Sequence, residues 1–341
     1  MSKIQEALAL LAERQDLPSE LAKAAMDELM DGLATPSQVG AFLMGLRTKG
    51  ESVEEVTAFA RAMREHSVRI QPQLDTLIDV CGTGGAPLKT FNISTTAAFV
   101  VAGAGVAVAK HGNRSSTAPS GSADVLEALG VQLAVSPETV QAAIESIGIG
   151  FLFAPGHHPA MKHAIGPRKE LALRTVFNML GPLTNPAGAN VHLMGVFSPH
   201  LVEMYPHVLH QLGVKRALVV HGMDGVDEFS TLGETFVGEL NGGQVSHRRV
   251  RPEQFGISST TLEAVKNIPP AQSAELTRNL LSGKVQDARL EIMLLNAGAA
   301  LYAAGRADSI EAGMTVAAES IKSGAAADKL DALVAHTNRQ A

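Results

Sequence analysis

Short apolar runs alternate with longer helical segments from about residue 76 onward, and this alternation restricts the possible folds more than any other feature of the chain. The runs have the length of buried strands, which are usually four to eight residues long. Strands that alternate with helices are typical of an α/β domain with a mostly parallel sheet. The predicted strands cover residues 76–80, 106–109, 149–153, 192–197 and 217–220.

The region before about residue 68 contains only helical patterns. Thr35 followed by Pro36 predicts a helix start, because threonine is a good N-cap and proline fits the first helical position. Ser52 with Glu55 three positions later forms a capping box, and the helix that follows has one apolar face. This pattern predicts a small bundle of helices.

The two patterns divide the chain into two domains. We predict a small N-terminal helical domain over residues 1–72 and a larger α/β domain, with a mostly parallel central sheet, over residues 73–341. The alternation of strands and helices is interrupted over residues 157–186, which contain prolines, glycines and several cations. We expect part of 160–190 to pack on the helical domain or to border a cleft. The turn at 241–243 predicts a hairpin that joins residues 235–240 to residues 244–250.

Composition excludes several classes of protein. The formal net charge is −6, so no overall electrostatic attraction to nucleic acid or to an anionic membrane is expected. A hydrophobic fraction of 45% excludes a disordered chain, and a single cysteine excludes a disulfide framework. No apolar run is long enough to span a membrane. We expect a soluble cytoplasmic protein with no membrane partner.

The densest motif is Gly82-Thr83-Gly84-Gly85, which follows the first predicted strand, and residues 90–95 then open a helix. Glycines at a strand end and the free N–H groups of a helix N-terminus together make a cradle for an anion. The glycine spacing fits neither a dinucleotide fingerprint nor a P-loop. The alternative is a tight turn with a helix cap at Asn92 or Ser94.

A second motif follows the strand 106–109. Residues 110–117 combine two or three cations, an amide and three hydroxyls, and Ser120-Gly121-Ser122 then begins a helix. Lysine, arginine and hydroxyl groups are the donors that phosphate binding needs. Ligands of open α/β sheets bind at the carboxyl ends of the strands, where this motif is expected. The alternative is a solvated polar loop.

The third motif is the acidic turn 224–228, which follows the strand 217–220. Neighbouring carboxylates suit Mg²⁺, which also binds phosphate oxygens, although acidic surface turns are common. Elsewhere, His157-His158 are expected to line a polar site rather than to bind a metal. Arg168 with Lys169 is either a surface basic pair or a clamp for a carboxylate substrate.

Taken together, these motifs resemble the anthranilate phosphoribosyltransferase family. The matches run in order from about residue 30 to residue 300, so the resemblance covers most of the chain. Single matches are modest, whereas the ordered set is specific. The segments that carry the resemblance are 82–85, 90–95, 110–114, 120–124, 158–161, 168–171, 177–183, 185–186 and 227–228.

The resemblance implies a fold and a reaction. The fold is a helical domain beside a larger α/β domain, as in the pyrimidine nucleoside phosphorylases, and the assembly is a homodimer formed through the helical domains. The reaction belongs to tryptophan biosynthesis: the amino nitrogen of anthranilate attacks C1 of 5-phosphoribosyl 1-diphosphate and releases pyrophosphate. Neither a nucleic acid nor a membrane is implied as a partner.

The resemblance also implies which residues form the site. The residues that would hold 5-phosphoribosyl 1-diphosphate are Gly82, Gly85, Thr90, Asn92, Ile93, Ser94, Thr95, Lys110, Asn113 and Ser122. Those that would bind or surround anthranilate are Gly82, His111, Asn113, His158 and Arg168. Mg²⁺ would be carried by Ser94, Asp227 and Glu228. No nucleophile or triad is found, so we expect catalysis by positioning and electrostatics.

The chain departs from the family pattern at two places. Ala86-Pro87 stands where the family usually continues with aspartate, with Lys89 nearby, and Ala118-Pro119 replaces a hydroxyl residue and a cation. Both changes concern diphosphate and Mg²⁺ affinity more than the type of reaction. The other functions considered are a nucleoside phosphorylase of the same fold, a transferase for a related aminobenzoate, and a non-catalytic nucleic-acid-binding relative.

Overall fold

The computed structural model describes residues 1–115 and 119–339. Its N-terminal part is a helical bundle in which both predicted caps are present. Thr35 Oγ1 accepts a hydrogen bond from the Gln38 N–H, and Ser52 Oγ accepts one from the Glu55 N–H. The bundle consists of α1 (Lys3–Ala12), α2 (Ser19–Met30), α3 (Pro36–Lys49) and α4 (Val53–Glu65).

The centre of the larger part is one seven-stranded sheet with the order β3-β2-β1-β4-β5-β6-β7. The first five of these strands are parallel, and β6 and β7 form the predicted antiparallel hairpin at the edge. The prediction of a mostly parallel sheet is therefore confirmed. The strands are β1 (Leu77–Gly82), β2 (Ala107–Gly112), β3 (Ile149–Phe153), β4 (Val191–Gly195), β5 (Arg216–Gly222), β6 (Thr235–Asn241) and β7 (Gln244–Val250).

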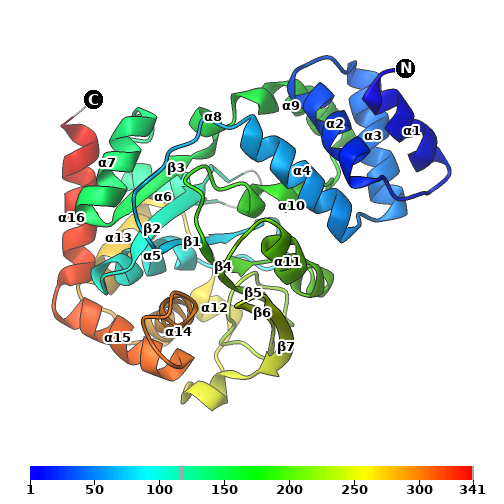
Figure 1. Cartoon of the computed structure of the whole chain (residues 1–341). Coiled ribbons are helices and arrows are strands. Elements are labelled where there is room, and N and C mark those ends of the chain that lie inside the picture. Colours follow the sequence, from blue (N-terminus) through cyan, green and yellow to red (C-terminus); the bar gives the residue numbers. More distant parts are fainter. Residues whose placement is uncertain (116–118, 340–341) are drawn as a thin grey trace.

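Helices cover both faces of the sheet (Figure 1). α5 and α14 pack on one face, and α11 packs on the other together with α4 of the bundle. The bundle lies at one end of the molecule and the C-terminal helix α16 at the opposite end. The remaining helices are α5 (Ile93–Gly103), α6 (Ser122–Ala128), α7 (Pro137–Ile147), α8 (Ala154–His157), α9 (Lys162–Leu171), α10 (Phe177–Leu180), α11 (Pro199–Gln211), α12 (Leu262–Val265), α13 (Pro270–Leu281), α14 (Ala288–Ala303), α15 (Ile310–Lys322) and α16 (Ala325–Asn338).

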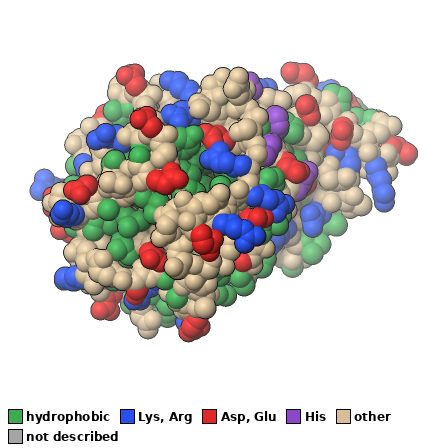
Figure 2. All heavy atoms as spheres, turned by 90° about the horizontal axis from the view of Figure 1, so that it is seen from below, with side chains coloured by type: hydrophobic (Ala, Val, Ile, Leu, Met, Phe, Trp, Pro, Cys, Tyr) green, Lys and Arg blue, Asp and Glu red, His purple; other side chains and the backbone are tan. Residues whose placement is uncertain are grey.

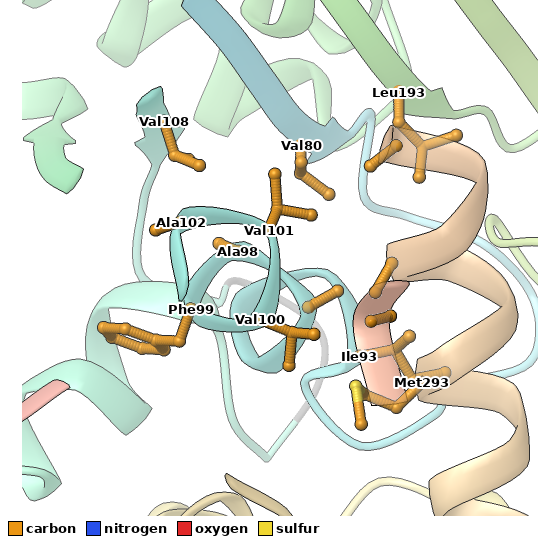
Figure 3. Packing of buried hydrophobic residues seen from close by; sticks show 14 of the residues in the cluster. Val80, Ile93, Ala98, Phe99, Val100, Val101, Ala102, Val108, Leu193 and Met293 are labelled. Atoms are coloured by element: carbon orange, nitrogen blue, oxygen red, sulfur yellow. The ribbon is translucent and has the colours of Figure 1, made fainter. Parts of the chain in front are cut away.

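The two faces of the sheet belong to different hydrophobic clusters. On one face, Val80 of β1 packs on α5, which is buried on nearly all sides, and Met293 of α14 lies beside Ile93 of the same helix α5 (Figure 3). On the other face, Met194 of β4 belongs to the cluster that contains Phe42 and Phe59 of the bundle. The bundle and the sheet therefore share one core rather than having separate interiors.

The position of β1 in the sheet creates a natural ligand site. The chain passes from β1 to β2 and β3 on one side and later adds β4 and β5 on the other, so the order of the strands reverses between β1 and β4. Open α/β sheets bind ligands at the carboxyl ends of the strands at such a point. The two strands end at Gly82 and Gly195, which are paired in register.

Three strands, β1, β2 and β5, extend beyond their predicted carboxyl ends, and β5 continues to Gly222 instead of residue 220. The strand predicted over 192–197 ends earlier, at Gly195. β1 continues to Gly82 and β2 to Gly112, so Lys110 and His111 lie on the strand rather than in the loop after it. The reason is the parallel neighbour β3, whose Phe151 and Leu152 pair with these two residues. A lysine and a histidine are therefore fixed in the sheet beside the carboxyl ends of the strands.

Candidate active site

The loop after β5 lies directly against the ends of β1 and β4. A Cβ atom placed on Gly195 would be 1.6 Å from the carbonyl oxygen of Asp227, and one on Gly82 would be 3.4 Å from Asp227 Oδ2. Gly195 thus allows backbone to approach backbone, and this contact brings the acidic motif to the reversal point of the sheet. Sequence reasoning did not single out Gly195, since it follows an ordinary apolar strand.

Asp227 and Glu228 form an acid pair that faces the two anion-binding motifs. Asp227 accepts a hydrogen bond from the Gly84 N–H, and Glu228 accepts one from the Ser94 N–H at the start of α5. Burial raises the pKa of both carboxyls, and the charge of Asp227 helps to raise the pKa of Glu228 to about 8. Two such carboxylates with a hydroxyl beside them form a donor set that suits Mg²⁺.

Asp224, the first acid of the same motif, has a different role. Its Oδ2 accepts a hydrogen bond from Ser230 Oγ at 2.5 Å, and its Oδ1 accepts one from the Val226 N–H at 3.1 Å. The carboxylate therefore shapes the turn from within. The acid pair that remains consists of Asp227 and Glu228.

Lys110 joins three parts of the site. Its side chain is buried, and Nζ donates a hydrogen bond to the carbonyl oxygen of Val80 at 2.6 Å and to Ser94 Oγ at 3.4 Å. Burial lowers the pKa of the Lys110 ammonium, while the charges of Asp79 and Glu228 act in the opposite direction. The ammonium is thus held between β1, the N-terminus of α5 and the acid pair.

The predicted diphosphate residues at the start of α5 are anchored by distant parts of the chain. Asn92 Oδ1 accepts hydrogen bonds from Ser120 Oγ at 3.0 Å and from Ser273 Oγ at 2.7 Å. The side chains of Ile93 and Thr95 are buried, so these two residues present backbone to the site. The cap that the sequence alternative assigned to Asn92 is absent, because its side chain makes no hydrogen bond to the helix N-terminus.

The first turn of the motif is also supported from elsewhere. Asn267 Nδ2 donates a hydrogen bond to the carbonyl oxygen of Thr90 at 2.8 Å. The Arg174 guanidinium donates to the carbonyl oxygen of Gly85 and lies 4.7 Å from the ring centroid of Phe197. Neither Asn267 nor Ser273 belongs to a motif that sequence reasoning could have detected.

Hydrogen bonds to the Asn113 carbonyl oxygen join the beginning of the second motif to the helix start at Ser122. Ser122 Oγ donates a hydrogen bond to the carbonyl oxygen of Asn113 at 3.2 Å, and the Ala123 N–H donates to the same oxygen. The side chain of Asn113 is exposed. Ala118 of the second family departure lies outside the described residues, whereas Pro119 is described and exposed.

His111 and His158 face each other at the end of β2. Their ring centroids are 5.1 Å apart, and His111 Nδ1 is 3.2 Å from the carbonyl oxygen of Gly181. Burial lowers the pKa of His111 to about 3 and that of His158 to about 4, so both rings are neutral at physiological pH. Among the described residues, neither Nε2 atom has a hydrogen-bond partner. The pair thus consists of two neutral rings, tilted by 51° to each other, whose Nε2 atoms are unpaired among the described residues.

A buried carboxylate holds His111 in place. Asp79 Oδ1 accepts a hydrogen bond from the His111 N–H at 3.2 Å, and Asp79 Oδ2 accepts one from Asn185 Nδ2 at 2.8 Å. Burial raises the pKa of Asp79 to about 6, although these hydrogen bonds and Lys110 oppose the rise. Sequence reasoning missed this role, although an acid inside an apolar strand was a visible sign of it.

Arg168 lies on a helix that packs on the bundle. It is carried by α9, which contacts α2 and α3 of the bundle. Its guanidinium carbon lies 5.2 Å from the ring centroid of Phe177, and burial lowers its pKa. In the part of the chain that the structure describes, no hydrogen bond or ion pair joins its side chain to the other predicted residues.

The first family departure places a cation beside the acid pair. Ala86 is buried, and Leu88 donates its N–H to the carbonyl oxygen of Gly225 at 3.3 Å, so this segment packs on the acidic turn. Burial lowers the pKa of Lys89, while the charge of Asp227 acts to raise it. Near Asp227 the chain therefore has an ammonium group and lacks a third carboxylate from residue 86.

The face of the molecule drawn in Figure 2 carries both signs of charge. Figure 2 shows lysine, arginine and acidic side chains interspersed on one face, with histidines along the line where the larger part of the molecule narrows toward the smaller. Neither sign forms a continuous field there, in contrast to the basic stripe of a nucleic-acid-binding surface. No helix in the described residues is both long enough and apolar enough to cross a membrane.

The fold and site define a class of glycosyltransferase. Residues 5–67 match the model of the glycosyl transferase family helical bundle domain, and residues 74–327 match that of the glycosyl transferase family a/b domain. The chain is thus an enzyme of the pentosyltransferase type.

Full-length relatives narrow the class to one family. The chain is 50% identical to an anthranilate phosphoribosyltransferase from Desulfosudis oleivorans over 97% of its own length and 98% of the relative's. It is 52% identical to one from Symbiobacterium thermophilum, with 97% of each chain covered. The chain therefore belongs to the anthranilate phosphoribosyltransferase family.

Solved structures agree with this assignment. The crystal structure of the Thermus thermophilus enzyme of that name superposes with a TM-score of 0.93 at 43% identity, covering 99% of this chain and 100% of that one. The Saccharomyces cerevisiae enzyme in complex with PRPP and Mg has a TM-score of 0.91 at 28% identity, with 98% of each chain covered.

Proposed function

We propose that this enzyme transfers the 5-phosphoribosyl group of 5-phosphoribosyl 1-diphosphate to the amino nitrogen of anthranilate, with release of pyrophosphate, in tryptophan biosynthesis. The observation that carries the proposal is the meeting of Ser94, Lys110 and the acid pair Asp227–Glu228 at the reversal point of the sheet. The Saccharomyces cerevisiae enzyme, which shares the fold, is described in complex with PRPP and Mg.

The donor substrate is assigned to the glycine turn, the start of α5 and the end of β2. Free N–H groups and the buried Lys110 ammonium provide donors for phosphate oxygens. Because Ile93 and Thr95 are buried, they act through their backbone. The residues proposed for this substrate are Gly82, Gly85, Thr90, Asn92, Ile93, Ser94, Thr95, Lys110, Asn113 and Ser122.

Mg²⁺ is assigned to Ser94, Asp227 and Glu228. The residues fit the ion, because burial raises the pKa of both carboxyls, the charge of Asp227 adds to the rise at Glu228, and a nearby cation would relieve both. All three residues also offer oxygen donors, which Mg²⁺ prefers. When bound, the ion neutralises negative charge that builds up on the departing pyrophosphate. Lys89, beside Asp227, adds a fixed positive charge on the same side.

Anthranilate is assigned to the side of the site formed by Gly82, His111, Asn113, His158 and Arg168. The two histidine rings are neutral and aromatic, which suits contact with an aromatic ring. Arg168 is the cation for the carboxylate of the substrate, since a guanidinium binds a carboxylate through two parallel hydrogen bonds.

The chemistry then needs no protein nucleophile. The lone pair of the arylamine nitrogen forms a bond to C1 while the bond from C1 to the diphosphate oxygen breaks, and the electron pair of that bond leaves with the oxygen. The nitrogen then loses one proton to solvent or to the released pyrophosphate. The protein aligns the two substrates and stabilises the developing charge, which are among the largest sources of enzymatic rate enhancement.

Anthranilate fluorescence provides the test. When the purified chain is mixed with anthranilate, 5-phosphoribosyl 1-diphosphate and Mg²⁺, the anthranilate fluorescence is expected to decrease with time. Omission of any one component is expected to abolish this decrease. Turnover with another aminobenzoate in preference to anthranilate would support the related transferase instead. Phosphate-dependent cleavage of a nucleoside, or salt-sensitive DNA binding without turnover, would support the remaining alternatives.

We also propose a homodimer that forms through the helical bundles. Leu33, between α2 and α3, is an apolar side chain that is 72% exposed on the bundle surface. Sedimentation equilibrium is expected to give about twice the chain mass of 35.7 kDa, and Leu33→Asp is expected to lower the association constant. A single-chain mass at micromolar concentration would contradict the proposal.

A further inference from the structure

The polar turn after β2 is closed by one carboxylate at the start of α6. Asp124 Oδ2 accepts a hydrogen bond from the Ser115 N–H at 3.1 Å and another from the Gly121 N–H at 2.9 Å. These two donors lie on opposite sides of the turn. A single oxygen atom therefore holds the outgoing and returning segments of the chain together.

The two segments also touch directly. A Cβ atom placed on Gly121 would lie 2.4 Å from the Ser115 nitrogen and 3.0 Å from the Asn113 oxygen. The absence of a side chain at residue 121 thus lets the returning segment lie against the outgoing one. Ser122, the next residue, then reaches the Asn113 oxygen through its hydroxyl.

Arg114 is engaged by the same carboxylate. Its Nη1 donates to Asp124 Oδ1 at 3.1 Å, and its two terminal nitrogens donate to the Glu127 carboxylate at 2.9 Å each. Both terminal nitrogens of the guanidinium are therefore engaged by carboxylates of α6. Sequence reasoning had counted Arg114 among the cations available to a phosphate.

We propose that Asp124 is a positioning residue that holds Asn113 and Ser122 in their binding geometry, with Arg114 as its counter-ion rather than as a ligand of the diphosphate. The proposal rests on the proposed function, because Asn113 and Ser122 are assigned there to the donor substrate. Asp124 itself touches no substrate and acts through the turn that it closes.

Four variants separate the parts of this arrangement. Asp124→Ala removes the acceptor for both N–H groups and the ion pair. Asp124→Asn keeps one oxygen for the two N–H groups but turns an NH₂ toward Arg114, and Arg114→Ala removes only the cation. Glu127→Gln is the matched control, since Glu127 pairs with the Arg114 side chain and, among the described residues, accepts no hydrogen bond from the backbone of the turn.

The KM for 5-phosphoribosyl 1-diphosphate is expected to rise about tenfold or more in Asp124→Ala, since two charge-assisted hydrogen bonds are lost. Asp124→Asn and Arg114→Ala are expected to show similar, smaller increases, and Glu127→Gln to stay within about twofold of the parent chain. Hydrogen exchange at the Ser115 and Gly121 amides, measured without substrate, is expected to accelerate in Asp124→Ala and to change little in Glu127→Gln.

Two results would overturn the proposal. A larger rise of the KM in Arg114→Ala than in Asp124→Ala would make Arg114 a ligand of the diphosphate. Unchanged KM and unchanged amide exchange in Asp124→Ala would mean that the carboxylate does not hold the turn. Failure of the proposed function is seen separately, as absent turnover in the parent chain, and the amide exchange then still tests the role of Asp124.

Discussion

Replacement of Gly195 by alanine tests the contact on which the site is built. The new Cβ atom would be 1.6 Å from the Asp227 carbonyl oxygen and 2.6 Å from its carbonyl carbon, whereas real Cβ contacts are essentially never shorter than 3.0 Å. The acidic turn and the end of β4 must therefore separate by about 1.4 Å, which is the difference between the 3.0 Å minimum and the 1.6 Å distance to the carbonyl oxygen. Both partners are backbone, so no side-chain rotation relieves the clash.

Two magnitudes follow from this displacement. Misplacement of a reacting or binding group by about 1 Å costs on the order of 100-fold in rate, so turnover is expected to fall by about that factor or more. Overpacking of a close contact costs about 1–3 kcal/mol of stability. At about 2–4 °C per kcal/mol, the melting temperature is expected to fall by roughly 2–12 °C.

The assay compares Gly195→Ala with Gly238→Ala. A Cβ atom on Gly238 would lie 2.4 Å from the Val202 carbonyl oxygen, so this variant has the same kind of clash, between β6 and α11 and away from the acid pair. Both variants are expected to melt earlier. Only Gly195→Ala is expected to lose turnover about 100-fold and to need more Mg²⁺ for half-maximal rate. Equal turnover and Mg²⁺ response in the two variants would refute the reasoning.

Three further predictions concern single side chains. Arg168→Ala is expected to raise the KM for anthranilate about tenfold or more and to leave that for the diphosphate substrate within about twofold, because only anthranilate carries the carboxylate; equal effects on both constants would exclude the clamp. Asp227→Asn is expected to raise the Mg²⁺ concentration needed for half-maximal turnover, and an unchanged Mg²⁺ titration would contradict its role as a ligand. His192 is buried in β4, and burial lowers its pKa from 6.5 to about 3. The unfolded chain therefore binds a proton below pH 6.5 that the folded chain does not, so stability falls as the pH drops from about 6.5 toward 3, by at most about 1.4 kcal/mol per pH unit. Thermal melts of His192→Gln at about pH 7 and about pH 5 are expected to differ less than those of the parent chain, and an identical difference would show that this histidine does not titrate as described.

Local patterns predicted the elements of the fold, because each element carries its own signal. Thr35 and Ser52 begin helices through contacts within three residues, and the apolar runs identify buried strands. The ends of β1 and β2 were predicted two to three residues too early. Their true ends depend on pairing with Gly195 and Phe153, far away in the sequence, and local composition does not contain that information.

In the candidate site, too, local motifs could be predicted from the sequence, whereas contacts between distant residues could not. The glycine turn, the polar turn and the acid pair were visible as motifs, and the rule for strand ends placed them at one edge of the sheet. The side chains that hold them were not visible. Asn185 contacts Asp79 across 106 positions, and Ser273 contacts Asn92 across 181, so neither appears near the motif that it supports. Arg114 was counted as a phosphate donor because a sequence does not show that two carboxylates already engage it.

The shared core of bundle and sheet has a consequence during synthesis. α4 ends at Glu65, while α9, which packs on α2 and α3, begins at Lys162, and the apolar strand β4 follows only after that. Ribosomes add about 5–20 residues per second, so roughly 5–20 s pass between the synthesis of α4 and the synthesis of the segments that cover the inner face of the bundle. During this interval Phe42 and Phe59 lack part of the cluster that buries them in the finished molecule. The first quarter of this chain is therefore the part that most needs protection from other nascent chains.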